Sequence, residues 1–333
     1  MSVVVRVEEQ SGVGDARRRS VALARDAGLG DQDQATLALV VTELATNLVK
    51  HTPAGGEMLF RAIGPARAVE VLAVDRGPGI EAIADALRDR YSTTGTSGTG
   101  LGAVKRLAAQ FEVQSTPKAG SVVLARVGGL TPQPDGIASG GVCVPKRGET
   151  VSGDAWTETV TGAVRRVIVA DGVGHGPDAA RAAGEALRVF RARPETPLPE
   201  LMRHLHDALR PTRGAAIAIA ELDAEAQRLR FIGVGNIVAA VSAPPSASGA
   251  TQRNLVSHPG TVGHEIRRVQ EFVDDWPRGA TLVLHSDGAR ARWSLASYPG
   301  IANRDPAVIA GVLYRDFSRG TDDVTVVALR GTR

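Results

Sequence analysis

The stretch VVTELATNLVKH, residues 40–51, decides the fold of the N-terminal part of the chain. Its apolar residues recur at helical spacing and extend back to Leu37, which predicts an amphipathic helix over residues 33–51. Glu43 and Asn47 lie four residues apart on one face of that helix, at the border of its apolar stripe. Such a pair can point into a half-buried pocket, but taken alone it favours a solvated helix edge.

Two glycine-rich segments further along the chain change that interpretation. VLAVDRGPGI, residues 71–80, reads as a strand that ends in Asp75, whose carboxylate can accept a hydrogen bond from an adenine amino group. The glycines after it lack a Cβ and let the backbone approach a flat base. STTGTSGTGLGAVKRL, residues 92–107, places glycines before a predicted helix, where backbone N–H groups and the positive helix end can bind phosphates. Together the three segments predict a nucleotide pocket.

The pattern of elements predicts two domains of α+β class. Residues 1–128 indicate one α/β unit, with helices first and then a sheet of mainly antiparallel strands. The following residues 129–137 lie in a stretch rich in Gly and Pro and predict a linker. Over residues 138–333 strand-like runs dominate and helical stretches interrupt them in blocks. This texture predicts a sandwich of sheets flanked by helices.

Composition limits the classes of function. The 333 residues are 43% hydrophobic and 23% charged, which is enough for packed cores in two domains. The formal net charge is +3, and the arginines are scattered without a basic stripe, which disfavours nucleic-acid binding. The single cysteine, Cys143, excludes an internal disulfide and zinc clusters of the CxxC type. MSVVVRVEEQ, residues 1–10, does not resemble a signal peptide, and no apolar run approaches the ~18 residues of a membrane span, so we expect a cytoplasmic protein.

Acidic residues mark the ends of apolar strands in the C-terminal part. Asp154 lies in SGDAW, Asp171 in VIVADGVGHG, Asp287 in LVLHSDGA, and the pair Asp322 and Asp323 in GTDDVTVV. An acid between a strand and a glycine is often simple turn chemistry. Four such sites together favour a site for hard divalent cations, which prefer carboxylate and carbonyl oxygens. Two such ions a few ångströms apart can activate a water for attack on a phosphate ester.

The N-terminal segments resemble the N, G1 and G2 boxes of the GHKL ATPase superfamily. TELATN, DRGPGI and YSTTGTSGTGLGAVKRL carry the resemblance, which covers residues 1–127 and is nearest to switch kinases of the RsbT type and the related anti-sigma-factor kinases. It implies an α/β sandwich that binds ATP with Mg²⁺. It also implies that Glu43 is the general base for an attacking hydroxyl, that Asn47 holds the metal and that Asp75 binds adenine. The implied nucleotide-binding residues are Asn47, Asp75, Gly77, Gly79, Gly98, Gly100 and Gly102.

The C-terminal order GD, DGxGHG, SDG and DD resembles the SpoIIE-type branch of the metal-dependent serine/threonine phosphatases, most closely its short RsbX-type members. The resemblance covers residues 138–333 and implies a β-sandwich of the PPM type with two Mn²⁺ or Mg²⁺ ions. The implied metal ligands are Asp154, Asp171, the carbonyl of Gly172, Asp287 and Asp322, with Asp323 as the adjacent candidate.

Two features of this C-terminal pattern leave alternatives open. The family often has another acid shortly after GD, whereas this chain has Trp156 there and Glu158 as the nearest acid. His175, in the DGVGHG turn, fits a catalytic proton donor to a leaving serine oxygen and fits a loop histidine bonded to backbone equally well.

These resemblances predict a bifunctional partner-switching regulator. The N-terminal module would phosphorylate a serine or threonine of a STAS-domain anti-sigma-factor antagonist or stressosome-type protein, and the C-terminal module would dephosphorylate the same or a related partner. A sigma factor, a downstream phosphatase or an activator is a further candidate partner. The alternative is a phosphatase whose N-terminal module only senses ATP, docks a partner or acts as an anti-sigma-like binding module without kinase turnover.

Overall fold

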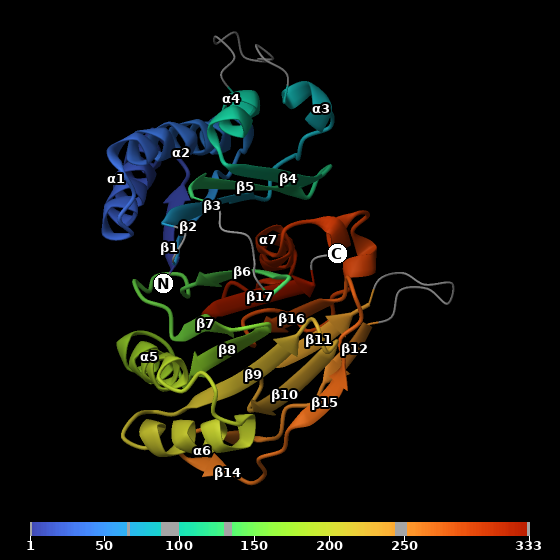
Figure 1. Cartoon of the computed structure of the whole chain (residues 1–333). Coiled ribbons are helices and arrows are strands. Elements are labelled where there is room, and N and C mark those ends of the chain that lie inside the picture. The colour runs from blue at the N-terminus through green and yellow to red at the C-terminus, as the bar shows by residue number, and fades with distance from the viewer. Residues whose placement is uncertain (1, 65–66, 88–99, 130–134, 244–251, 332–333) are drawn as a thin grey trace. The chain divides into compact units, whose positions relative to one another are not determined.

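The computed structural model of the chain describes residues 2–64, 67–87, 100–129, 135–243 and 252–331 (Figure 1). The chain separates into two compact units, Met1–Pro132 and Gln133–Arg333. Both units combine helices with antiparallel sheets, which confirms the predicted α+β class. Within the described residues, no helix is both long enough and apolar enough to cross a membrane.

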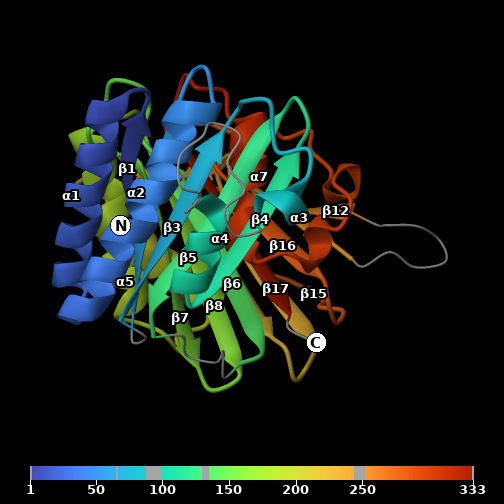
Figure 2. The ribbon, with the colours of Figure 1, turned by 90° about the horizontal axis from the view of Figure 1, so that it is seen from above.

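The first unit is built on a five-stranded antiparallel sheet with strand order β1-β2-β3-β5-β4. Helices α1, α2 and α4 cover one face of this sheet, and α1 and α2 pack against each other along it (Figures 1 and 2). Its elements are β1 (Ser2–Val7), α1 (Gln10–Asp26), α2 (Asp31–His51), β2 (Gly56–Ile63), β3 (Ala68–Asp75), α3 (Ile83–Ala86), α4 (Gly100–Leu107), β4 (Gln110–Thr116) and β5 (Gly120–Gly128).

The first strand differs from the order expected from the sequence, in which helices come first. Residues Ser2–Val7 form β1, which pairs with β2 at the edge of the sheet and places Val5 opposite Met58. Val5 and Val7 lie two residues apart in the strand, so both side chains point to the core side of the sheet, where they are 4% and 0% exposed. The short run of valines is therefore a strand because two of them reach the helix-covered side of the sheet.

The second unit is a sandwich of two five-stranded sheets, with strand orders β15-β10-β9-β8-β7 and β12-β11-β16-β17-β6. A small two-stranded sheet, β13-β14, completes it. Its elements are β6 (Ile137–Val144), β7 (Asp154–Thr161), β8 (Val164–Gly172), α5 (Pro177–Arg191), α6 (Leu198–Leu209), β9 (Ala215–Asp223), β10 (Arg228–Val234), β11 (Val238–Ser242), β12 (Gln252–Leu255), β13 (Gly260–Thr261), β14 (Glu265–Ile266), β15 (Phe272–Asp275), β16 (Thr281–His285), η1 (Leu295–Ser297), η2 (Ile301–Asn303), α7 (Pro306–Phe317) and β17 (Val324–Gly331).

Apolar side chains from both sheets meet in the interior of this sandwich. Val167 and Phe231 from one sheet and Leu284 and Val327 from the other belong to a single buried cluster. Helices α5 and α6 pack on the outer face of the first sheet, and α7 packs against β6 and β17 of the second (Figure 1). This is the predicted architecture of a β-sandwich flanked by helices.

One long apolar run, residues 228–242, is divided between the two sheets. Strand β10 ends at Val234, Gly235 adopts a φ of +105°, and β11 begins at Val238 in the other sheet. A Cβ on Gly235 would lie 2.4 Å from the Cβ of Ala216, so only glycine fits this crossing. The crossing leaves Asn236 exposed in the short connection between the sheets.

Candidate functional site

Helix α2 presents the two polar residues of the opening motif at the edge of its buried stripe. Glu43 and Asn47 are both half-buried, while their neighbours Leu44 and Leu48 are 1% and 4% exposed. Helix α4, which ends the glycine-rich segment, packs against α2 in the same core. The helix that carries the pair therefore packs against the described end of the segment that was predicted to bind phosphates.

Asp75 is the last residue of β3 and begins the turn that follows this strand. Its Oδ1 accepts a hydrogen bond from the N–H of Gly77 at 2.7 Å. Gly79 has a φ of +77°, and a Cβ on it would lie 2.5 Å from the carbonyl oxygen of Thr116. Close approach of the backbone therefore requires glycine at position 79, and the half-buried carboxylate of Asp75 lies in the same turn.

The phosphate-binding segment is only partly described. Gly100 begins α4, and Gly102 is buried within it. Gly98, also predicted to contact phosphate, lies outside the described residues, as does Gly95. The described part of the segment therefore provides a helix N-terminal region next to α2, while the roles of these glycines stay a prediction.

In the second unit, strand pairing brings the predicted acids together. Asp154 begins β7 and Asp171 lies near the end of β8, and the antiparallel register sets the two directly opposite each other. Asp154 is 4% exposed, and its Oδ2 accepts a hydrogen bond from the hydroxyl of Ser286 at 2.6 Å. Burial, and then repulsion from Asp323 and Asp287, raises the pKa of Asp154, although the hydrogen bond from Ser286 opposes the rise.

Asp171 has the same kind of environment. Burial and then the charges of the other four acids raise its pKa to about 8. The acids whose charges act on Asp171 are Asp154, which faces it across the strand pair, and Asp287, Asp322 and Asp323.

The outer members of this acid cluster come from two further strand ends. Asp287 follows β16 and is exposed, and its Oδ2 accepts a hydrogen bond from Nδ2 of Asn236 at 2.7 Å. Asp322 is half-buried and its Oδ1 accepts from the N–H of Asp323 at 2.9 Å. Asp323 is 3% exposed and accepts from the N–H groups of Lys146 and Gly153 at 2.7 and 2.8 Å. Asp323 therefore anchors the loop that precedes Asp154, while Asp322 keeps more freedom.

Gly172 links the acid cluster to α5. A Cβ at this position would lie 2.3 Å from the carbonyl oxygen of Ala179 in the first turns of the helix, so the residue must be glycine. Its N–H donates to the carbonyl of Gly153 at 3.1 Å, which ties the end of β8 to the start of β7. The backbone of Gly172, next to Asp171, is thus held between α5 on one side and the start of β7 on the other.

The donor set fits a hard divalent cation. In the described residues no three His, Cys, Asp or Glu side chains are arranged to hold a metal ion as they stand. The carboxylates of Asp154 and Asp171 nevertheless repel each other at a buried strand pair, and a cation between such groups would relieve that repulsion. Carboxylate and carbonyl oxygens without thiolates are the donors of Mg²⁺ and Mn²⁺ sites rather than of zinc clusters.

His175 projects from the turn between β8 and α5. Its Nδ1 lies 2.7 Å from Oε1 of Glu149, on the loop between β6 and β7, and both side chains are partly exposed. A carboxylate on Nδ1 fixes the ring and leaves Nε2 for a second partner. The contact with Glu149 therefore orients the imidazole through Nδ1 and does not involve Nε2.

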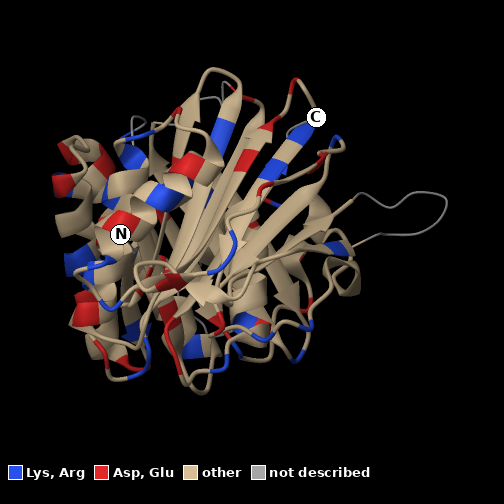
Figure 3. Cartoon of the chain, turned by 90° about the horizontal axis from the view of Figure 1, so that it is seen from below, with Lys and Arg blue, Asp and Glu red and all other residues tan. Residues whose placement is uncertain are grey.

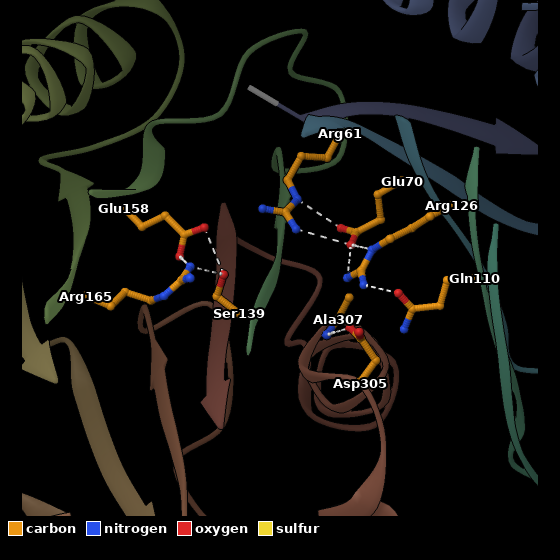
Figure 4. A network of polar contacts seen from close by, with 9 residues as sticks. All are labelled: Arg61, Glu70, Gln110, Arg126, Ser139, Glu158, Arg165, Asp305 and Ala307. Carbon is orange, nitrogen blue, oxygen red and sulfur yellow. Dashed lines mark hydrogen bonds and ion pairs between the residues drawn. The ribbon is translucent and has the colours of Figure 1, made fainter. Parts of the chain in front are cut away.

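Glu158, the nearest acid after GD, belongs to a different network. Its Oε2 accepts from Nη1 of Arg165 at 2.8 Å, and its Oε1 accepts from the hydroxyl of Ser139 at 2.8 Å (Figure 4). Arg165 also forms an ion pair with buried Asp135 at 2.7 Å. Glu158 is thus committed to an ion-pair network along the sheet.

Cys143 is free and half-buried, as expected for a plain thiol. Its Sγ lies 3.3 Å from the carbonyl oxygen of Asp154, and desolvation, with the charge of Asp154, raises the pKa of the thiol to about 11. A thiol with so high a pKa is a poor nucleophile at neutral pH.

Three residues beside the acid cluster had no role in the sequence-based prediction. Ser286 bonds to Asp154, Asn236 bonds to Asp287, and Glu149 bonds to His175. Ser286 could have been found from the sequence, because it directly precedes Asp287 in the SDG motif. Asn236 and Glu149 lie 51 and 26 residues from their partners, so no local pattern pairs them.

The β-sandwich with clustered strand-end acids defines the second unit as a phosphatase of the SpoIIE type. The family model described as Stage II sporulation protein E (SpoIIE) matches residues 162–332. Since this is about half of the chain, the chain belongs to the SpoIIE family.

The first unit has its own relatives. The family model described as a histidine kinase-like ATPase domain matches residues 8–127. Serine/threonine-protein kinase RsbT of Bacillus subtilis (strain 168) is 30% identical over 122 residues, which are 36% of this chain and 92% of RsbT. The chain therefore joins a homologue of a serine/threonine kinase to a phosphatase domain, and both predicted resemblances are confirmed. This combination supports a role in partner-switching regulation.

Solved structures agree with the fold. A structure described as "The bacterial stressosome: a modular system that has been adapted to control secondary messenger signaling" has a TM-score of 0.53 and 27% identity, and the match covers 58% of this chain and 99% of that one. A crystal structure of RsbX in complex with magnesium has a TM-score of 0.50 and 17% identity, over 60% of this chain and 98% of RsbX. The second likeness shows the fold alone.

Proposed function

We propose that this protein is a bifunctional partner-switching enzyme. Its first unit transfers a phosphoryl group from ATP to a serine or threonine of a STAS-domain partner, and its second unit removes phosphate from the same or a related partner. One observation carries the proposal: each of the two units brings together a separate set of oxygen donors suited to phosphate chemistry, Glu43 and Asn47 in one and the acid cluster in the other.

The kinase half of the proposal assigns roles to α2 and the strand end beside it. Glu43 would accept the proton of the attacking hydroxyl, and the amide oxygen of Asn47 would be a ligand of the Mg²⁺ that accompanies ATP. Asp75 accepts a hydrogen bond from the adenine amino group, with Gly77 and Gly79 allowing close approach of the base. ATP with Mg²⁺ supplies the activated phosphoryl group. Transfer of this group depends mainly on positioning and charge neutralisation, which fits a site without a covalent nucleophile.

The remaining phosphate-binding assignments belong to the segment before α4. Gly98, Gly100 and Gly102 are proposed to surround the phosphates with backbone N–H groups. The proposed use of ATP also fits a cytoplasmic location.

The phosphatase half assigns the acid cluster to two Mn²⁺ or Mg²⁺ ions. Bound metals would supply Lewis-acid activation of water and of the phosphate ester. His175, oriented by Glu149, donates a proton to the leaving serine oxygen. The proposed metal-holding residues are Asp154, Asp171, the Gly172 carbonyl, Asp287 and Asp322.

The choice of partner follows the relatives. RsbT is a serine/threonine kinase, and one structural relative comes from work on the stressosome. A STAS-domain anti-sigma-factor antagonist or a stressosome-type protein is therefore the proposed substrate.

The two halves are separable by mutation. Glu43→Ala should lower phosphorylation of a STAS-domain protein by at least ~100-fold, because general bases typically contribute 10²–10⁴-fold, and it should leave dephosphorylation intact. Asp171→Asn should abolish dephosphorylation and leave phosphorylation intact. Radiolabelled ATP and the phosphorylated partner measure both rates. Phosphorylation by Glu43→Ala at the wild-type rate would reject the assigned base and favour a binding module without kinase turnover.

A further inference from the structure

The turn after β8 forms a rim beside the acid cluster. Val173 follows Gly172 directly, and its side chain is 45% exposed although it is apolar. The carbonyl oxygen of Gly174 lies 3.4 Å from the position that a Cβ on Gly153 would take, and Gly153 precedes Asp154. This rim is thus adjacent to the acids in both sequence and space.

A second loop brings an arginine to the same rim. Arg213 lies between α6 and β9, where Gly214 accepts a hydrogen bond from the N–H of Val173 at 3.0 Å. Nη1 of Arg213 lies 3.3 Å from the position of a Cβ on Gly174. The guanidinium therefore lies against Gly174 in this turn, and a larger side chain at position 174 would crowd the guanidinium.

Within the described part of the chain, this guanidinium forms one ion pair, through Nη2. Nη2 of Arg213 lies 2.8 Å from Oδ2 of Asp178, in the first turn of α5, and the two side chains are 52% and 50% exposed. An ion pair so exposed is worth at most ~1 kcal/mol of stability, so fold stability gives little reason for the arrangement. Asp178 instead fixes the direction of an arginine that has five N–H donors in a planar fork.

We propose that Arg213 binds a carboxylate next to the phosphorylated residue of the protein substrate and so sets the specificity of the second unit for acidic sequences. The inference rests on the proposed phosphatase function. The guanidinium of Arg213 is held at this rim by the turn and by Asp178, and its planar fork matches a carboxylate in a bidentate contact. Val173 adds the exposed apolar contact that interface centres commonly combine with arginine.

The test compares two phosphoserine peptides that differ only in charge. One carries aspartates beside the phosphoserine and the other carries lysines, and kcat/KM is measured for both with the full chain and Mn²⁺. Wild type should prefer the acidic peptide. Arg213→Glu should lower the ratio of acidic to basic kcat/KM at least ~10-fold, since a charge-assisted contact is replaced by repulsion.

Two further variants sharpen the test. Arg210→Glu makes the same charge change three residues away, where Arg210 is 66% exposed and pairs with Asp207, and it should leave the ratio unchanged. If Arg213→Glu fails to fold, Arg213→Gln should still bring the ratio toward one.

Each other outcome overturns the inference. An unchanged ratio in both Arg213 variants would show that the arginine does not bind the peptide. An equal fall of the ratio in Arg210→Glu would show that only the net charge of the protein matters. A parallel fall for both peptides and for p-nitrophenyl phosphate would place Arg213 at the phosphate itself. Failure of wild type to hydrolyse p-nitrophenyl phosphate would instead reject the proposed phosphatase function.

Discussion

The hydroxyl of Ser286 controls the orientation of Asp154. It donates to Oδ2 of Asp154 at 2.6 Å and accepts the N–H of Thr325 at 2.9 Å, and it has no exposed surface. Because the hydroxyl is fixed from both sides, it holds Oδ2 of Asp154 in one position. Partners that orient metal ligands typically contribute about 10–100-fold to metal affinity.

Ser286→Ala should therefore weaken Mn²⁺ binding by about 10–100-fold while the fold is kept. Isothermal titration of the full chain with Mn²⁺ measures the change, and Ser297→Ala, at an exposed position in η1, is the matched control. Equal affinities of Ser286→Ala and wild type would remove Asp154 from the proposed metal site.

The chemistry of single residues was predictable where a motif carries it. The sequence pointed to Asp171 and Asp287 because each lies between an apolar strand and a glycine, and to Asp154 through its GD motif. The structure sets Asp154 opposite Asp171, and the charge of Asp287 acts on both. It did not point to Asn236 or Glu149, because their contacts are created by the crossing between sheets and by a loop that folds back from β6. Whether Asp322 or Asp323 ligates a metal also depends on backbone contacts that a pattern does not contain.

Strand β3 carries an ion network on three neighbouring strands. The register places Glu70 between Arg61 on β2 and Arg126 on β5 (Figure 4). Glu70 is 2% exposed, its Oε1 lies 2.9 Å from Nε of Arg61, and its Oε2 lies 2.9 Å from Nε of Arg126. Burial disfavours the charge of Glu70, but the two guanidinium groups outweigh burial and lower its pKa.

This network predicts acid sensitivity of the first unit. The pKa of Glu70 is lower in the folded than in the unfolded chain, so its stabilisation is present above the unfolded pKa and is lost as pH falls through the folded pKa. Glu70→Gln should lower the local free energy of unfolding by about 3–5 kcal/mol at neutral pH, because buried Arg126 and half-buried Arg61 lose their charged partner. The difference from wild type should shrink as the pH falls.

Hydrogen exchange of β2, β3 and β5, read by mass spectrometry between pH 7 and acid, measures this effect. The three tryptophans, Trp156, Trp276 and Trp293, all lie in the second unit, so their fluorescence reports on that unit separately. Glu57→Gln is the control, because its partner Arg6 is 42% exposed and the pair should contribute under about 1 kcal/mol. A difference between Glu70→Gln and wild type that grows toward acid would contradict the predicted pKa shift.

Elements with a strong period were predicted better than their boundaries. The helix expected over residues 33–51 is α2, Asp31–His51. It begins two residues before the predicted start and ends at the predicted residue. Whether a short segment forms a strand depends on the strands beside it. The sequence alone did not predict β1, which the structure shows paired with β2.

The chain as a unit of function combines two compact units with opposite proposed activities. The predicted boundaries, 1–128, 129–137 and 138–333, stay a prediction. In the view of Figure 3, basic and acidic positions are intermixed over the described residues, so recognition is expected to depend on local groups such as Arg213. If both proposed sites work, the chain should run a cycle in which its partner is phosphorylated and then dephosphorylated.

Steady release of inorganic phosphate from ATP, measured with and without a STAS-domain partner, tests this central claim most directly. Wild type with Mg²⁺, Mn²⁺ and partner should release phosphate continuously. Asp171→Asn should transfer one phosphoryl group to each partner molecule and release no inorganic phosphate, Glu43→Ala should release none from ATP, and a mixture of the two variants should restore continuous release. A mixture that stays inactive while wild type cycles, or phosphate release by wild type that ignores the partner, would contradict the account.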